Sequence, residues 1–330
     1  MTQNSIPADE VRFYSGSSNR PLAASIAAEL GVPLEETRIK RFSNDNMYIQ
    51  LGASVRQRSV YILQSLSPPV NDHLVELLMM LDIAKDAAAS EVHVIIPYYS
   101  FGRSDKKDAP RISITARLVA DLLRTAGATH FMGMVFHSPQ VHGFFRIPAD
   151  PLTSRPVFAK YLEQRDLNNS IIVSPDMGMA KSAARFAGNL GLPIAAGNKE
   201  RVSDTEVKIS GLVGDQVKGH RHAVIYDDEI ATGGSILELS RVLLETGIED
   251  MLVVCTHGVF TRGGLEKLAS VPQISEIVTT DTVYIPEEKR HPKLTVLSVA
   301  PVFAEAIRHN FNRESLGDLF VYGEDKPKDT

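Results

Sequence analysis

The sequence predicts an α/β protein of two similar domains, each a mainly parallel β-sheet flanked by helices. Its 330 residues suffice for two domains of ordinary size. Hydrophobic residues make up 43% of the chain and charged residues 23%, which is the range of soluble globular proteins. Short apolar runs alternate with segments of helical spacing along the chain, and this alternation is typical of parallel sheets covered by helices.

In the first half, apolar runs of strand type alternate with helical segments that end at a glycine. Gly31 and Gly127 each follow such a segment, and a glycine in this place is a common helix stop. Asn71 or Asp72 has a side chain suited to cap the start of the second helix. Strands are expected at 11–14, 59–63, 92–96 and 130–136, and helices at 21–30, from 71 or 72 to about 89, and at 112–126.

The second half repeats this rhythm, so the two halves are expected to be similar α/β units. The junction is expected at 152–158, which gives an N-terminal domain of residues 1–155 and a C-terminal domain of residues 156–330. Strands are expected at 171–173, 222–226, 251–256 and 276–279, and helices at 180–190 and 235–246.

Charge and cysteine content exclude several classes of function. The net charge of −5 and the pI near 6.1 leave no basic domain, so no nucleic-acid partner is expected. One cysteine, Cys255, can form neither an internal disulfide nor a cysteine-type zinc site. No apolar run reaches the roughly 18 residues of a membrane span. The first residues lack the pattern of a secretory signal, and a cytoplasmic protein is therefore expected.

The strongest motif lies at 223–235, where an apolar strand leads to two carboxylates and a Thr-Gly-Gly-Ser turn that opens a helix. The glycines let backbone N–H groups converge on an anion, and the helix start adds favourable partial charge. Thr232 and Ser235 offer hydroxyls to phosphate oxygens, while Asp227 and Asp228 lie where sugar hydroxyls or a metal would bind. The alternative is an Asp-rich loop that only caps a helix.

This segment resembles the ribose 5-phosphate-binding motif of the phosphoribosyltransferase fold. Further motifs, in order from about Arg12 to Phe320, make the chain similar to ribose-phosphate pyrophosphokinase, also called phosphoribosyl pyrophosphate synthetase. The resemblance implies two phosphoribosyltransferase-like domains. The motifs are at 41–44, 71–78, 96–103, 105–108, 143–145, 174–176, 256–258, 280–282 and in the ending from 314–315 to 319–320.

The resemblance implies that ATP and ribose 5-phosphate give phosphoribosyl pyrophosphate and AMP, by attack of the sugar C1 hydroxyl on the β-phosphorus. In such transfers the protein mainly positions groups and stabilises negative charge. The resemblance implies that ribose 5-phosphate is bound by Asp227, Asp228, Ala231, Thr232, Gly233, Gly234 and Ser235. It implies that ATP is bound by Phe42, Asn44, Asn46, Arg103, Ser104, Asp105 and Asp108. It also implies Mg²⁺ binding by His137 and Asp176 and catalysis by Lys199 and Arg201.

Several of these residues have plainer interpretations from the sequence alone. His137 is a polar residue at a strand end, Asp176 a turn residue or helix cap, and Phe42 an ordinary core residue. Lys199 and Arg201 are surface charges in a polar stretch, 197–206, that suits a mobile lid.

The resemblance also implies an oligomer. In the family, a loop of the neighbouring subunit completes the adenine site, with Phe42 stacked on the ring and Asn44 and Asn46 at its polar edge. A dimer is therefore the minimal unit, and hexamers are expected. The active site is expected between the domains at the carboxyl ends of strands. Residues 302–322 are expected to fold back on the N-terminal domain.

The sequence departs from the family mainly on the nucleotide and metal side. Asn46 stands where Glu is usual, which removes a charged acceptor for the adenine amine. Ser104 replaces a Gln, and Val135 replaces an Asp two residues before His137, which removes a contact that could orient the histidine. The other departures are Asp45 for Gly, Met179 for Gly, Ser182 for Arg and Ala231 for Asp.

Three hypotheses follow. The first is an active synthetase with altered nucleotide preference or kinetics, the second a catalytically weak regulatory subunit, and the third a phosphoribosyltransferase that uses the same cradle. Retention of Lys199, Arg201, His137, Asp176 and Arg103 favours the first. The two-unit layout counts against the third.

Overall fold

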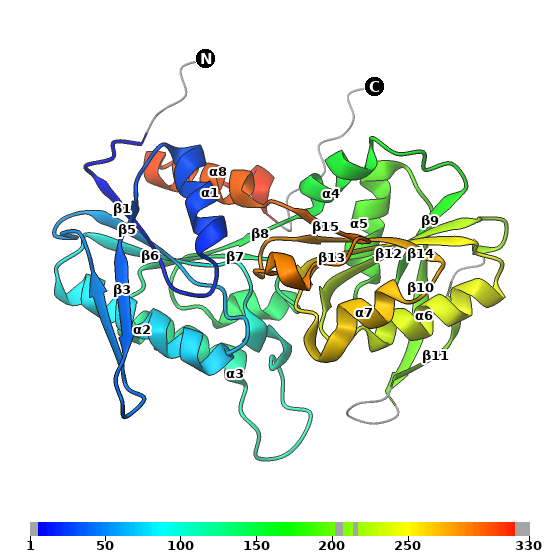
Figure 1. Ribbon diagram of the computed structural model, residues 1–330, viewed down its shortest axis with the longest axis horizontal. Coiled ribbons are helices and arrows are strands. Elements are labelled where there is room, and N and C mark those ends of the chain that lie inside the picture. The colour runs from blue at the N-terminus through cyan, green and yellow to red at the C-terminus, as the bar shows by residue number, and fades with distance from the viewer. Residues whose placement is uncertain (1–5, 202–206, 214–216, 321–330) are drawn as a thin grey trace. The chain divides into compact units, whose positions relative to one another are not determined.

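The computed structural model describes residues 6–201, 207–213 and 217–320 (Figure 1). The chain forms two compact units. Within the described ranges, unit 1 holds Ile6–Thr153, Thr282–Tyr284 and Val299–Phe320. Unit 2 holds Ser154–Asp281 and Ile285–Ser298. Among the described residues, no helix combines the length and apolar character needed to cross a membrane.

Unit 1 contains a six-stranded sheet in the order β2-β1-β5-β6-β7-β8. Every neighbouring pair in it is parallel. A separate antiparallel hairpin of β3 and β4, which the sequence analysis did not predict, follows β2. The strands are β1 (Val11–Ser15), β2 (Leu34–Glu35), β3 (Thr37–Arg41), β4 (Met47–Leu51), β5 (Ser59–Leu63), β6 (Glu91–Ile96), β7 (His130–Met134) and β8 (Ala149–Leu152).

Helices cover both faces of this sheet (Figure 1). On one face, Leu77 and Met80 of α2 and Val119 of α3 join the buried core with Ile62 and Val94 of the sheet. On the other face α1 packs against α8, which comes from the far end of the chain. Helix α8 does not correspond to any helix expected from the sequence. The helices are α1 (Arg20–Leu30), α2 (Val70–Asp86), α3 (Thr115–Ala126) and α8 (Ala300–Asn312).

Unit 2 contains a seven-stranded sheet in the order β11-β10-β9-β12-β13-β14-β15. The β10–β11 edge pair is antiparallel, and the other pairs are parallel. The strands are β9 (Ser170–Ser174), β10 (Ile194–Arg201), β11 (Val207–Val213), β12 (His222–Ile230), β13 (Asp250–Gly258), β14 (Ile274–Thr280) and β15 (Leu294–Leu297).

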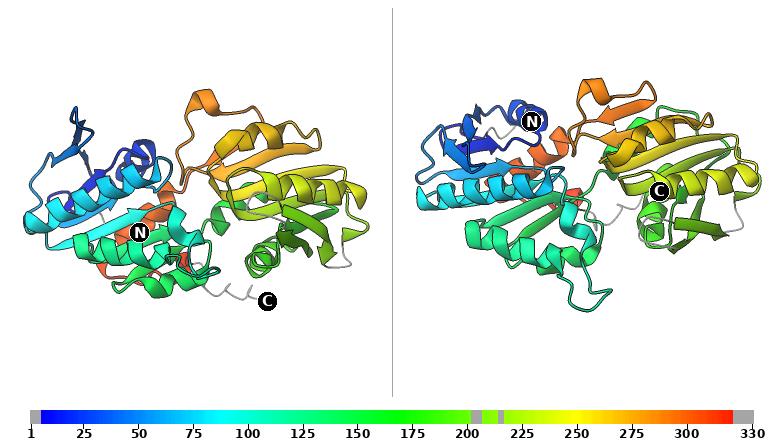
Figure 2. Two further views of the ribbon diagram at one scale, coloured as in Figure 1. Left: turned by 90° about the horizontal axis from the view of Figure 1, so that it is seen from below. Right: turned by 60° about the horizontal axis from the view of Figure 1, so that its bottom comes forward.

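Two helix pairs cover the unit 2 sheet, and Figure 2 shows α6 and α7 side by side on one face. Ile236 and Leu239 of α6 and Leu265 of α7 pack there on β12 and β13. Phe158 of α4 and Phe186 of α5 pack on the opposite face. The helices are α4 (Arg155–Leu162), α5 (Ala180–Leu190), α6 (Gly234–Glu245) and α7 (Gly264–Ala269).

The two sheets share one chain order, and this confirms the predicted fold class. In each, the first strand of the unit lies inside the sheet, and the chain adds strands first on one side of it and then on the other. The switch falls between β1 and β5 in unit 1 and between β9 and β12 in unit 2. Ligands of open α/β sheets bind outside the carboxyl ends of strands at such a switch point. The unit 2 switch point carries the strongest sequence motif.

Several predicted boundaries were wrong. Helix α2 begins at Val70 after Pro69, so neither Asn71 nor Asp72 caps it. The Asp72 carboxylate instead contacts Arg41, with 2.9 Å between Nη2 and Oδ2. Helix α3 begins three residues later than expected. Strand β12 continues past its expected end at residue 226 to Ile230, because its pairing with β13 extends that far.

Candidate active site

The anion-binding turn of unit 2 connects β12 to α6. Residues 231–233 make the turn, with Gly233 in the left-handed region at φ 78°. No side chain caps the start of α6. The first N–H groups of a helix have no partner within the helix, so they are available to an external acceptor. The turn therefore has the backbone that a phosphate site requires.

Helix α7 packs directly against this turn. A Cβ atom at Gly264 would lie 2.6 Å from the carbonyl oxygen of Ala231. A Cβ atom at Gly233 would lie 3.1 Å from Cγ of Leu268. The backbone contact at Gly264 is too close for any side chain, so the start of α7 sets the position of the turn. Sequence reasoning missed Gly264, although the adjacent pair Gly263 and Gly264 was a visible signal.

We expect Gly264→Ala to weaken ribose 5-phosphate binding by about tenfold or more, because the new methyl group displaces the Ala231 carbonyl and with it the turn. Isothermal titration calorimetry measures the effect. Gly188→Ala in α5 is the matched control, since a Cβ atom at Gly188 meets nothing within 4 Å. Equal affinities in the two variants would contradict this role of α7.

Three carboxylates gather at the switch point of unit 2. Asp227 and Asp228 come from β12, and Asp176 follows the neighbouring strand β9. The backbone N–H of Asp228 donates to Asp227 Oδ1 at 2.9 Å. Burial raises the pKa of Asp227 well above its usual range, and the negative charges of Asp228 and then Asp176 raise it further. A bound cation or a hydrogen-bond donor would relieve this repulsion.

Asp176 also has a structural role. Its Oδ1 accepts a hydrogen bond from the backbone N–H of Met179 at 3.1 Å, just before α5 begins. Ser182, in the first turn of α5, hydrogen-bonds the buried hydroxyl of Tyr226. The segment after Asp176 is therefore tied to β12 through Ser182.

At the switch point of unit 1, between β1 and β5, lies a carboxylate of the protein itself. Glu76, buried in α2, accepts from the Ser17 backbone N–H at 2.5 Å and from the Ser17 hydroxyl at 2.7 Å. Gln64 donates to it at 3.0 Å. An internal anion therefore occupies the switch point of unit 1, and the available cradle is that of unit 2.

The predicted nucleotide residue Arg103 and the predicted metal ligand His137 follow the carboxyl ends of β6 and β7. Arg103 ends a short 3₁₀ turn, Ser100–Arg103, after β6. This turn contacts His137, since a Cβ atom at Gly102 would lie 3.8 Å from His137 Cβ. Arg103 and His137 are both exposed. The structure therefore brings together the segments of Arg103 and His137.

Three further predicted nucleotide residues, Ser104, Asp105 and Asp108, lie in a long exposed loop after Arg103. Ser104 accepts, through its carbonyl, from the Ala116 N–H at 3.3 Å. Asp108 is exposed, and Asp105 is partly buried. The loop is thus attached at the start of α3 and extends into solvent, where charged side chains can meet a ligand.

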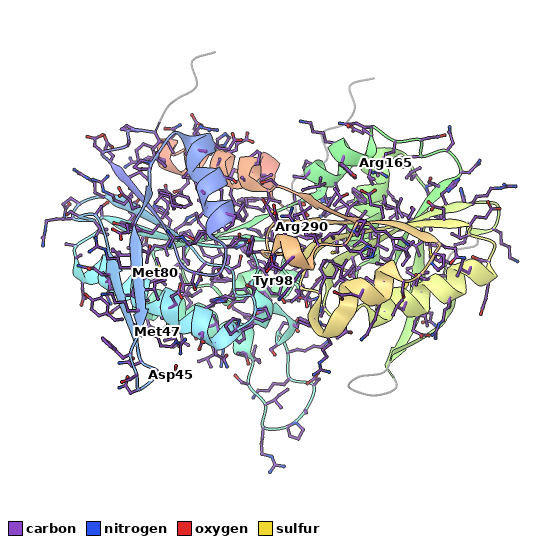
Figure 3. The ribbon with its side chains drawn as sticks, viewed as in Figure 1. Asp45, Met47, Met80, Tyr98, Arg165 and Arg290 are labelled. Atoms are coloured by element: carbon purple, nitrogen blue, oxygen red, sulfur yellow. The ribbon has the colours of Figure 1, made fainter. Side chains whose placement is uncertain are left out.

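The tip of the β3–β4 hairpin displays Phe42. Its side chain is 53% exposed and 6.2 Å from the Tyr48 ring centre, so it is not a core residue. Its N–H donates to the Asn46 carbonyl at 2.8 Å, and the Asn44 side chain accepts from the Asn46 N–H at 3.3 Å. Figure 3 shows Asp45 at the tip, where its positive φ of 67° explains why glycine was expected there.

Lys199 and Arg201 lie on β10, in antiparallel register with Ile209 and Val207 of β11. The stretch expected to be a loop thus begins as a strand, because β11 supplies its hydrogen-bond partners. Their side chains, and residues 202–206, lie outside the described residues.

Metal ligands do not converge in the described parts of the chain: no three His, Cys, Asp or Glu side chains there form a group able to hold an ion. His137 belongs to unit 1 and Asp176 to unit 2.

The fold is the α/β type that the sequence predicts, with the cradle at the switch point of unit 2. A family model described as the N-terminal domain of ribose phosphate pyrophosphokinase matches residues 11–127, and one described as a phosphoribosyl synthetase-associated domain matches residues 203–321. A putative ribose-phosphate pyrophosphokinase of Streptomyces coelicolor is 49% identical, covering 94% of this chain and 98% of its own. The chain belongs to the ribose-phosphate pyrophosphokinase family and is an enzyme.

Two further relatives agree with this assignment. Ribose-phosphate pyrophosphokinase of Deinococcus radiodurans is 44% identical over 93% of this chain and 97% of its own. The crystal structure of phosphoribosylpyrophosphate synthetase from Mycobacterium smegmatis superimposes with a TM-score of 0.86 at 35% identity, covering 92% of this chain and 99% of that one.

Proposed function

We propose that this enzyme transfers the pyrophosphoryl group of ATP to the C1 hydroxyl of ribose 5-phosphate, giving phosphoribosyl pyrophosphate and AMP. The observation that carries the proposal is the uncapped turn of unit 2 beside the Asp227 and Asp228 carboxylates. The turn, from Ala231 to Ser235, would hold the 5-phosphate. The carboxylates would accept hydrogen bonds from the ribose hydroxyls.

The nucleotide would be bound by unit 1. Arg103 would stabilise the triphosphate charge, and Ser104, Asp105 and Asp108 would contribute polar contacts from the exposed loop. The exposed ring of Phe42 supports a stacking role toward a base, with Asn44 and Asn46 at its polar edge. Lys199 and Arg201 would stabilise the charge that develops as AMP departs.

Mg²⁺ fits this site as an ion with few protein ligands. The repulsion among Asp176, Asp227 and Asp228, which the raised pKa of Asp227 reflects, favours a nearby cation. His137 and Asp176 would each contribute to holding it, and phosphate oxygens and water would complete its shell. When bound, the ion neutralises phosphate charge and so supports attack on the β-phosphorus.

A homo-oligomer is part of the proposal, with a dimer as the minimal unit and a hexamer expected from the family. Val75 on α2 and Leu118 and Leu122 on α3 are exposed by 47%, 46% and 37%. These two helices are neighbours and present an apolar face that a second copy would cover. Sedimentation velocity measures the oligomeric state.

We also propose a cytoplasmic location, in keeping with the single, buried Cys255.

Transfer of label from [γ-³²P]ATP tests the reaction. With ribose 5-phosphate and Mg²⁺, the label should appear in phosphoribosyl pyrophosphate while unlabelled AMP forms in equal amount. A phosphoribosyltransferase would leave ATP intact, and a regulatory subunit would turn over neither substrate.

Asp228→Ala should weaken ribose 5-phosphate binding more than ATP binding. Equal losses for both ligands would contradict a separate sugar site.

We expect Asn46→Glu to shift nucleotide preference toward ATP, because a carboxylate accepts more strongly from the adenine amine than a carboxamide does. The gain is about 1 kcal/mol, or several-fold in selectivity. The ratio of kcat/KM for ATP to that for GTP measures it. Asn168→Glu, at an exposed asparagine of unit 2, is the control. An unchanged ratio in Asn46→Glu would show that Asn46 does not contact the base.

A further inference from the structure

The switch point of unit 1 holds the Glu76 carboxylate among three hydrogen-bond donors. The loop after β1 supplies the Ser17 N–H and hydroxyl, and the segment after β5 supplies the Gln64 amide. The Gln64 nitrogen faces Glu76, because the Gln64 oxygen already accepts from the Ser18 N–H at 3.1 Å and from the Ser18 hydroxyl at 2.6 Å. Converging donors of this kind are what a protein offers to a bound oxyanion.

The backbone of this loop approaches the carboxylate closely. A Cβ atom at Gly16 would lie 2.6 Å from Glu76 Oε1, so any side chain there would displace the carboxylate. Glycine has the same role where a backbone turn approaches a phosphate. The neighbouring Ser17 is exposed, so solvent reaches the edge of the site.

The carboxylate comes from a helix position that is normally apolar. Glu76 is buried next to Leu77 and Met80, which belong to the core of unit 1. Burial of a carboxylate is unfavourable unless donors surround it. Helix α6 follows β12 as α2 follows β5, and its buried residues include no acidic side chain: Ile236, Leu239, Ser240 and Leu243. The carboxylate is therefore a feature of the unit 1 switch point that the helix of unit 2 does not repeat.

The loop that Glu76 holds also anchors another segment of unit 1. The Asn19 amide donates to the Thr282 carbonyl at 3.4 Å, and the Ser65 hydroxyl donates to the same oxygen at 2.6 Å. Thr282 belongs to unit 1, whereas the chain up to Asp281 belongs to unit 2. A loop with this task needs one fixed conformation, and an internal ligand that cannot dissociate provides it.

We propose that the switch point of unit 1 is an oxyanion-binding site that Glu76 keeps closed, with its carboxylate in the place of an external ligand. While this side chain is present, the site takes no external anion, and the cradle of unit 2 is the open one. When the side chain is shortened, the site takes a small carboxylate such as acetate. The proposal concerns unit 1 and is independent of the reaction proposed above.

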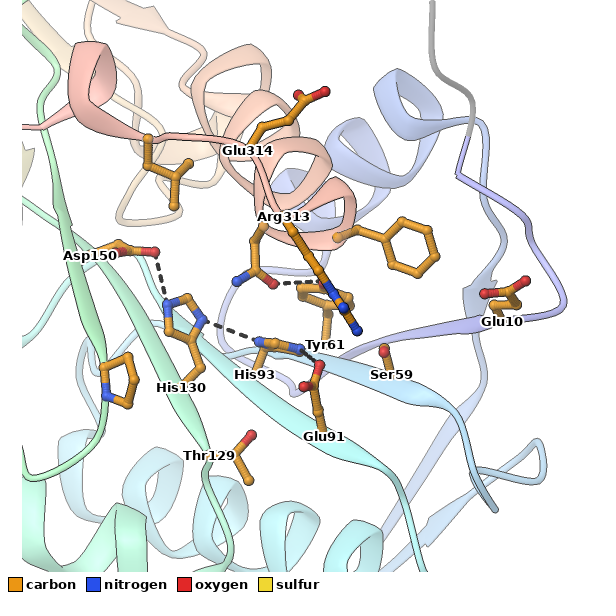
Figure 4. A pocket seen from close by; sticks show the side chains of 14 residues that line it. Glu10, Ser59, Tyr61, Glu91, His93, Thr129, His130, Asp150, Arg313 and Glu314 are labelled. Carbon is orange, nitrogen blue, oxygen red and sulfur yellow. Dashed lines mark hydrogen bonds and ion pairs between the residues drawn. The ribbon is translucent and has the colours of Figure 1, made fainter.

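A polar cavity at the opposite end of the unit 1 sheet does not compete for such an anion. Its volume is about 720 Å³, and Figure 4 shows it at the amino ends of β5, β6 and β7, where the Tyr61 hydroxyl donates to Asn310 Oδ1 at 2.9 Å. Acidic side chains outnumber the single arginine in its lining, which has Glu10, Glu91, Asp150 and Glu314 against Arg313. This charge disfavours anions, whereas the Glu76 site lies at the carboxyl ends of β1 and β5.

Glu76→Ala tests the proposal in the full-length enzyme, because it removes the γ-carbon and the carboxylate, which together correspond to an acetate ion. Acetate at about 0.1 M should raise the Tm of this variant by about 3 °C or more relative to NaCl of the same ionic strength. Acetamide, which has the shape of acetate without its charge, should not. The unaltered enzyme should respond alike to acetate and chloride, since its site is filled.

Met80→Ala is the matched control. Met80 lies one turn further along α2 and is fully buried among apolar side chains, so its truncation opens a cavity without donors. Acetate should stabilise this variant no more than chloride does. Calorimetry should detect one acetate per chain of Glu76→Ala, bound about tenfold more weakly when Ser17→Ala removes the hydroxyl donor as well.

Refolding makes the same comparison if Glu76→Ala does not fold in buffer alone. Recovery of folded protein from urea in acetate, but not in acetamide, would support the proposal, and recovery in neither would overturn it. Equal effects of acetate on Glu76→Ala and Met80→Ala, equal effects of acetate and acetamide, or an acetate affinity that does not change with Ser17→Ala would also overturn it.

Discussion

Lys199→Ala should lower kcat by about 10²–10³ while changing the affinity for either substrate far less. Cleavage of the bond between the α- and β-phosphates moves negative charge onto the oxygen that leaves with AMP. A lysine that meets this charge as the reaction proceeds stabilises the transition state more than the bound substrates. Steady-state kinetics at saturating ATP and ribose 5-phosphate measure the effect.

Lys218→Ala is the matched control, since Lys218 is an exposed lysine of the same unit. It should leave kcat within about two-fold. Arg201→Ala should resemble Lys199→Ala, and the double variant should be less than additive, because both residues would act on one developing charge. A near-normal kcat in Lys199→Ala would overturn its assignment as a catalytic residue.

Asp227→Asn should stabilise the unliganded enzyme at neutral pH and weaken ribose 5-phosphate binding by about tenfold. Burial beside Asp228 and Asp176 makes the ionised Asp227 carboxylate unfavourable in the folded state. Asparagine removes that charge, and a gain of 1 kcal/mol would raise Tm by about 2–4 °C. It also removes a charged acceptor for a sugar hydroxyl, which is typically worth about 1.5–3 kcal/mol.

The pH dependence of this stabilisation follows from the direction of the pKa shift. Because the folded pKa of Asp227 is raised, the folded state holds the proton more tightly than the unfolded state does. The contribution of Asp227 to the stability of the unaltered enzyme is thus fully present below the unfolded pKa, about 3.9, and is lost as pH rises through the folded pKa. The Tm difference between Asp227→Asn and the unaltered enzyme should grow over that window. A Tm difference that is constant with pH would contradict ionisation of Asp227 as the cause.

Local elements with strong signals could be predicted from the sequence. Strand β5 and helix α5 have the predicted bounds, since a compact apolar run and a periodic segment closed by Gly191 each determine their own limits. The β3–β4 hairpin was missed because charged residues interrupt its apolar pattern. Helix α8 was missed although Pro301 in its first turn is a helix-start signal.

In the candidate active site, too, only the part with a strong local signal could be predicted from the sequence. The cradle is one contiguous segment, so its residues could be named from spacing alone. The approach of Asp176 to Asp227, the support by Gly264 and the internal carboxylate of Glu76 depend on strand order and helix packing. None of these contacts has a signature in the linear sequence.

The return of α8 to unit 1 has a consequence for synthesis on the ribosome. Tyr61 and its partner Asn310 are 249 residues apart, and α8 covers a face of the first sheet. At about 5–20 residues per second, β5 waits about 12–50 s for its cover to be translated. Unit 2 is nearly continuous in the chain and can close during this wait. The domain made first is therefore the one finished last, and its exposed apolar face is the natural substrate of a chaperone during translation.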